Sequence, residues 1–238
     1  MGDNTTEQRE RQARWATSYS TMTIREAEER LGIQIDELGA VPLDIVLLSA
    51  RNLEGVDADV ILKAKEEVYK QIIQYIKVEG YPRGDSTDFN KANLDDLVYS
   101  IISPILEDFM HKTGRKIRLE RDEEIISTNN ETGGMGEFVV VDQISETEKK
   151  FVLLIQGKRS SVGEGMNQCL LSLKDMRDNN GGGEVYGFIT TGETWQMLRN
   201  DDKEKWIKDY SALVDCMFGA LSNGGILRQR WFPSIVFA

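Results

Sequence analysis

The sequence has one histidine and two cysteines among its 238 residues. With His111 as the sole imidazole, a metal site built on several histidines of one chain is excluded. A metal ion would need oxygen ligands, which means a hard cation such as Mg²⁺ or Mn²⁺. Cys169 and Cys216 lie in segments with helical periodicity and are too few for a disulfide scaffold. They are typical of a reducing compartment, so we expect an intracellular protein of the cytoplasm or nucleus.

Long apolar runs are also lacking. No segment approaches the roughly 20 apolar residues needed to cross a bilayer. The first ten residues are polar and charged, unlike a secretory signal peptide. We therefore expect no membrane partner. A hydrophobic content of 40% with 29% charged residues is ordinary for a globular protein of one large or two small domains.

An excess of positive charge is missing as well. The net charge of −11 argues against strong nonspecific binding of nucleic acid, because contacts to many phosphates usually need a basic surface. Such binding would depend on local clusters, although a solvated face is the simpler interpretation of each. The clusters are Arg115, Lys116, Arg118 and Arg121; Lys149, Lys150, Lys158 and Arg159; and Arg228 and Arg230.

The first part of the chain carries no functional motif. We assign residues 1–56 to an N-terminal arm that packs on the rest or mediates self-association, which makes a homodimer one expectation. It contains a short helix that Thr23 caps with Glu26 and that Gly32 ends. Residues 57–238 are assigned to a second domain.

Hydrophobic periodicity predicts two long helices at the start of that domain, over residues 57–79 and 93–113. Asn93 is expected to cap the second helix, Pro104 to kink it, and Gly114 to end it. Residues 128–136 are expected to form a polar loop.

Strand patterns dominate the next part. We predict a strand over 115–127, an antiparallel hairpin over 137–155, a helix containing Gln168 and a strand beginning near Val185. A crossover through the helix allows a parallel strand pair. A last helix is expected over 203–223, and the apolar tail 226–238 is expected to pack on the body. The fold class is α/β, with a central mixed β-sheet flanked by helices.

Polar residues follow a buried strand at one point. Residues 151–155 are all apolar, which indicates a strand buried on both faces. Gln156 and Lys158 then share one face, and Glu137 begins the partner strand of the hairpin. A carboxylate and an amide oxygen beside an ammonium are groups that hold a divalent cation and stabilise charge during phosphodiester displacement. The alternative is that Gln156 and Lys158 simply leave the core at a strand end.

The same residues resemble a known family. Gly-Glu-Phe-Val-Val-Val-Asp (136–142), Phe-Val-Leu-Leu-Ile-Gln-Gly-Lys-Arg (151–159), the helix with Gln168, and Val-Tyr-Gly-Phe-Ile-Thr-Thr-Gly-Glu-Thr-Trp (185–195) occur in this order. This order is similar to the PD-(D/E)XK nuclease superfamily, and closest to restriction-endonuclease-like domains of fungal and Crinkler-type proteins. The resemblance covers residues 115–200 well, and the two preceding helices loosely. It implies a restriction-endonuclease-like three-layer core.

The resemblance also implies roles for single residues. Glu137 takes the place of the first metal-binding acid, Lys158 that of the catalytic lysine, and Gln168 that of the helix glutamine that supports the site. Gln156 stands where the family has Asp or Glu, so the predicted metal ligands are Glu137 and Gln156, with Mg²⁺ or Mn²⁺ held weakly or not at all. Asp95 or Asp108 is a candidate for a further acid from the preceding helix.

Four other features have plainer interpretations. Asp142 is expected to begin the hairpin turn, and the glycines at 181–183 to end a helix. Cys169 is expected in the core, since no histidine partner accompanies it for thiol catalysis. Trp195 is expected to pack against the sheet.

The function expected from the resemblance is metal-dependent hydrolysis of phosphodiester bonds in nucleic acid, most naturally DNA, by a form that Gln156 leaves inactive or impaired. The alternative is a noncatalytic module that keeps the fold and binds nucleic acid or protein.

Overall fold

The computed structural model describes residues 15–35, 38–40, 58–82, 89–158, 162–199, 203–207 and 210–224. The strands are β1 (Thr17–Ser18), β2 (Gly39–Ala40), β3 (Ile117–Ile126), β4 (Thr132–Gln143), β5 (Lys149–Gly157), β6 (Tyr186–Thr190), β7 (Trp195–Arg199) and β8 (Lys203–Ile207). The helices are the 3₁₀ turn η1 (Tyr19–Thr21), α2 (Ile24–Leu31), α4 (Ala58–Glu79), α5 (Lys91–Thr113), α6 (Val162–Asn179) and α7 (Tyr210–Asn223).

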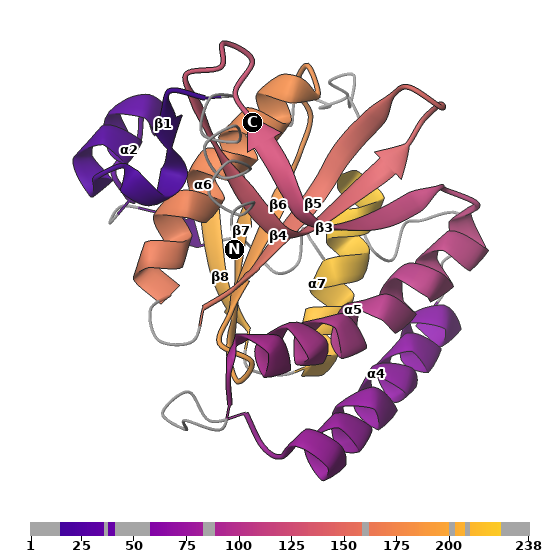
Figure 1. Cartoon of the computed structure of the whole chain (residues 1–238). Helices are drawn as coiled ribbons and strands as arrows, with labels where there is room; N and C mark the ends of the chain where they lie inside the picture. The colour runs from indigo at the N-terminus through magenta and orange to yellow at the C-terminus, as the bar shows by residue number, and fades with distance from the viewer. Residues whose placement is uncertain are drawn as a thin grey trace, which may run out of the picture.

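These elements form a mixed β-sheet with helices on both faces, which confirms the predicted α/β class (Figure 1). The strand order is β1-β4-β5-β6-β7-β8-β2, and β3 pairs with β4 outside this path. The predicted hairpin is antiparallel, with Phe138 opposite Ile155. β5 and β6 are parallel and joined through α6, as the crossover requires.

The sheet separates two apolar cores. Alternation along β4 sends Phe138 and Val140 to the core formed with α4, α5 and α7, and Val139 and Val141 to the core formed with α6. In Figure 1, α4 and α5 run side by side on the first face, whereas α2 lies beside α6 on the other. The run Val152 to Ile155 is fully buried, as a strand covered on both faces should be.

The prediction of a loop over residues 128–136 is partly wrong, because β4 already begins at Thr132. Glycines occur here because aromatic side chains of the N-terminal segment pack directly on the strand. A Cβ atom on Gly133 would lie 2.7 Å from the Trp15 ring, and one on Gly134 would collide with Tyr19. The glycines therefore provide close approach within a strand rather than loop flexibility.

The predicted last helix is also wrong in its first part. Residues 203–207 form β8, which pairs antiparallel with β7, and the helix begins only at Tyr210. The hairpin partner supplies backbone hydrogen bonds that override the helical preference read from the isolated segment.

Helix boundaries agree well with the capping signals. Thr23 and Glu26 form the predicted capping box of α2, which ends at Gly32 in the left-handed region. α5 ends at Gly114 as predicted, but its N-cap is Asn90 and not Asn93. Asn93 is instead the third helical residue, and its side chain accepts from the backbone N–H of Asn90.

The N-terminal segment packs on the body. β1 extends the sheet beside β4, and α2 contacts α6. The predicted boundary between residues 56 and 57 and the predicted apolar tail 226–238 lie outside the described residues. Within the described part of the chain, no helix has the length and apolar character needed to span a membrane.

Candidate functional site

Glu137, Gln156, Lys158 and Gln168 lie together at the carboxyl end of β5. The β4–β5 ladder has Phe138 opposite Ile155, so the next step along both strands sets Glu137 beside Gln156. On the other side, Gln156 pairs with Ile189 of the parallel strand β6. The backbone N–H of Lys158 continues this pairing by donating to the carbonyl of Thr190 at 2.8 Å.

Glu137 is held by both neighbouring elements. Its Oε2 accepts a hydrogen bond from the backbone N–H of Gly157 at 2.6 Å and another from Nζ of Lys91 at 2.9 Å. Its Oε1 lies 3.7 Å from Nζ of Lys158. Both oxygens of this carboxylate are therefore already engaged by donors or positive charge.

Lys158 reaches from the strand end to α6. Its ammonium donates to Oε1 of Gln168 at 3.2 Å, so the predicted helix glutamine orients the predicted lysine. The lysine stem passes over Gly165, where a Cβ atom would lie only 2.8 Å from Cγ of Lys158. Gly165 thus leaves the room that this side chain needs.

Gln156 is the most deeply buried polar member, with 2% of its surface exposed. Side-chain alternation sets it on the face of Leu154, toward α6. Among the residues that the structure describes, its buried Oε1 has no hydrogen-bond partner. A buried amide oxygen of this kind is costly unless a donor or ligand engages it.

Sequence reasoning missed Lys91, the first residue of α5. Its ammonium bonds Glu137 and also Asp95, one helical turn further along. Burial lowers the pKa of Lys91, but the two carboxylates raise it by more, so the net shift of the pKa is upward. The spacing from Lys91 to Asp95 is visible in sequence, whereas the contact to Glu137 joins residues 46 positions apart.

The structure separates the two candidate acids of α5. Asp95 reaches the cluster through Lys91. Asp108 instead pairs with Lys63 of α4 at 3.2 Å. Asp95 is therefore the acid that belongs to this site.

Cys169 lies beneath the cluster and is fully buried, as predicted for a core residue. Burial raises the pKa of its thiol to about 12; Lys158 lowers the pKa and Glu137 raises it further, both by smaller amounts. The thiol is protonated at neutral pH, which makes it a poor nucleophile.

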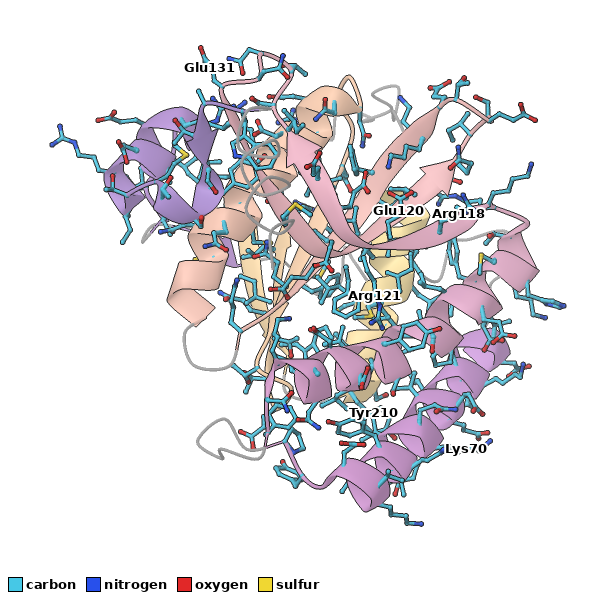
Figure 2. The ribbon with its side chains drawn as sticks, viewed as in Figure 1. Lys70, Arg118, Glu120, Arg121, Glu131 and Tyr210 are labelled. Atoms are coloured by element: carbon cyan, nitrogen blue, oxygen red, sulfur yellow. The ribbon has the colours of Figure 1, made fainter. Side chains whose placement is uncertain are left out.

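Arg115, Lys149 and Lys158 of the described basic clusters pair with acidic neighbours. Arg115 forms an ion pair with Asp142 at 2.8 Å. Asp142 lies within β4, which continues to Gln143, so the expectation that Asp142 begins the hairpin turn is wrong. Lys149 bonds Glu120 at 2.6 Å and Glu123 at 2.7 Å. Figure 2 shows Arg121 near the sheet and α5, where its guanidinium stacks over the Tyr99 and Phe138 rings. Arg159, Arg228 and Arg230 lie outside the described residues.

Besides the core position of Cys169, two of the plainer interpretations agree with the structure. Trp195 is 5% exposed and packs edge-on against Phe188 of the sheet. The glycines at 181–183 all have positive φ and follow the end of α6.

The donor set fits a divalent cation poorly as it stands. Magnesium sites in proteins rest on carboxylates that keep their negative charge available to the ion. Here the charges of Glu137 and Asp95 are matched by those of Lys91 and Lys158, and Gln156 supplies only a neutral oxygen. Among the described residues, no three His, Cys, Asp or Glu side chains are grouped so that they could hold a metal ion.

Comparison of the chain with protein-family models, with curated proteins and with solved structures finds no match.

Proposed function

We propose that this chain is a nuclease-fold protein of the restriction-endonuclease-like kind, whose site for metal-dependent hydrolysis of nucleic-acid phosphodiester bonds is impaired by Gln156. One observation carries the proposal. Glu137 of β4, Lys158 at the end of β5 and Gln168 of α6 converge within hydrogen-bonding or ion-pair distance at one strand end, and Gln156 of β5 lies beside them.

Each residue of this chain has a chemical task in the proposal. Lys158, 24% exposed and oriented by Gln168, offers a positive charge to a phosphate oxygen as negative charge develops there. Glu137 is held in place by the N–H of Gly157 and offers a carboxylate on the same side. Gln156 contributes a neutral oxygen where the chemistry calls for a second carboxylate, which explains the impairment.

DNA is the substrate class that we propose, with binding confined to the surroundings of Lys91 and Lys158. The acidic chain and the ion pairs that occupy Arg115 and Lys149 argue against a broad basic face. Binding should therefore be weak, and its affinity should fall only modestly with added salt because few phosphates are contacted.

The substitution Gln156→Glu tests the enzyme proposal. The variant is expected to cleave linear DNA at least about tenfold faster than the parent chain at millimolar Mn²⁺, because a buried carboxylate adds the missing negative charge. The gain should disappear in the Gln156→Glu/Lys158→Met variant, which removes the positive charge but keeps the aliphatic stem. A Gln156→Glu protein that folds but neither cleaves nor binds metal would refute the proposal.

A second candidate function is a noncatalytic module that binds nucleic acid or protein. The charge balance between two lysines and two carboxylates favours this second candidate, because the cluster is electrically neutral without a metal ion. This candidate predicts that Lys158→Ala leaves partner binding unchanged, whereas the enzyme proposal predicts weaker DNA binding.

A further inference from the structure

We propose that Lys91 acts as an internal cation that competes with divalent metal for the carboxylates of Glu137 and Asp95, so that the site is suppressed by Lys91 as well as by Gln156. This inference rests on the proposed function, since it concerns the same site. It differs in naming a residue outside the family resemblance and in predicting that the acid at position 156 alone restores only part of metal binding.

The first support is the contact itself. Nζ of Lys91 donates to Oε2 of Glu137 at 2.9 Å and also to Oδ1 of Asp95. These are the oxygens that a hard cation would need, and an ammonium bound to them must be displaced before a metal ion binds. Asp95 is 28% exposed and Glu137 19% exposed, so solvent screens the contact only in part.

The second support is that the surrounding backbone positions the ammonium of Lys91 beside Glu137. Asn90 and Asn93 form a capping box that fixes the start of α5 at Lys91, with Asn90 as the N-cap. On the strand side, Gly157 has no side chain where the lysine passes. A Cβ atom there would lie 3.4 Å from Nζ of Lys91 and 2.9 Å from Cδ2 of Leu94.

The third support is the charge of the cluster. Glu137 and Asp95 carry two negative charges, and Lys91 and Lys158 carry two positive ones. Gln156→Glu would leave the cluster with a single net negative charge. Removing the charge of Lys91 as well would leave two, which matches the charge of Mg²⁺ or Mn²⁺.

The experiment measures Mn²⁺ binding by isothermal titration calorimetry, with DNA cleavage as a second readout. The compared proteins are Gln156→Glu alone and the same variant combined with Lys91→Met, Lys91→Gln or Lys91→Arg. Two neutral replacements are included so that the test can still be made if one variant fails to fold. The arginine variant keeps the positive charge. The matched control is Lys174→Met, which removes a lysine that pairs with Asp178 at the same i,i+4 spacing on α6.

The neutral replacements at Lys91 are expected to tighten Mn²⁺ binding by about tenfold or more over Gln156→Glu alone, since a unit positive charge close to the ion is removed. The Lys91→Arg and Lys174→Met combinations should bind like Gln156→Glu alone. Equal binding by Gln156→Glu with and without Lys91→Met, or tightening by Lys91→Arg, would overturn the role of Lys91 while leaving the proposed function intact. If neither protein binds Mn²⁺ nor cleaves DNA, both proposals fail together.

Discussion

The side chain of Asp175 on α6 is predicted to hold the N-terminal segment to the body of the protein. Its carboxylate accepts hydrogen bonds from the Tyr19 hydroxyl at 2.7 Å, the Thr132 hydroxyl at 2.9 Å and Nη2 of Arg30 at 3.0 Å. Only 1% of this side chain is exposed. The three donors come from η1, β4 and α2, so one carboxylate joins α6 to three elements that are distant from it in sequence.

The cost of Asp175→Ala follows from this environment. Hydrogen bonds to a charged group contribute roughly 1.5–3 kcal/mol each, but they are not additive when they share one acceptor. Breaking a buried ion pair by removing one partner costs about 3–5 kcal/mol, because the remaining charge stays partly buried. We expect a loss of about 3–5 kcal/mol in the free energy of unfolding. Tyr19→Phe, which removes one donor, should cost about 1–2 kcal/mol.

Urea denaturation followed by circular dichroism measures these losses. Asp178→Ala is the matched control: it removes an aspartate from the same helix, but one that forms an exposed pair with Lys174. Such surface pairs contribute at most about 1 kcal/mol. If Asp175→Ala costs no more than Asp178→Ala, the carboxylate does not hold the N-terminal segment and the reasoning is wrong.

Two further predictions concern the packing around Cys169. A Cβ atom on Gly187 would lie 2.5 Å from Sγ of Cys169 and 3.0 Å from Cδ1 of Leu173, so Gly187→Ala should destabilise the protein by about 1–3 kcal/mol in urea denaturation. Adding Cys169→Ala should recover part of that loss, and simple additivity of the two changes would contradict the contact. Burial raises the pKa of the Cys169 thiol from 9.0 to about 12, so its contribution to stability is complete below pH 9 and declines by at most about 1.4 kcal/mol per pH unit between pH 9 and 12. The same decline in Cys169→Ala would show that other groups cause it.

Local signals in the sequence predicted most of the elements. The capping box at Thr23, the glycine at 114 and the apolar run before Gln156 each describe a short segment whose structure depends on its own residues. The hairpin and the parallel crossover follow from connection lengths alone. These are the parts that agree with the structure.

The parts that failed depend on partners that lie outside the mispredicted segment. Gly133 and Gly134 resemble loop residues until Trp15 and Tyr19 are seen to cover them. Residues 203–207 become a strand because β7 pairs with them. Both errors reflect tertiary contacts that override local preference.

The residues of the candidate site also differ in whether local sequence patterns predict them. Strand alternation was enough to predict that Gln156 and Lys158 share a face and that Glu137 lies near them. Lys91 was missed because its contact with Glu137 depends on the start of α5 packing beside the end of β5. No local sequence pattern predicts that packing. Its spacing to Asp95 resembles any stabilising helix pair.

Gln156 and Lys91 change the site in the same direction, since each removes negative charge from the place where a metal ion would bind. A glutamate at position 156 would be almost fully buried beside Glu137, and like charges so close raise the free energy of the folded protein when no cation compensates them. The amide avoids that repulsion, and the ammonium of Lys91 stabilises the carboxylates that remain. The cluster is thus stable without a metal ion, so under the proposed function the acid at 156 alone restores part of metal binding and full binding also requires the release of Lys91.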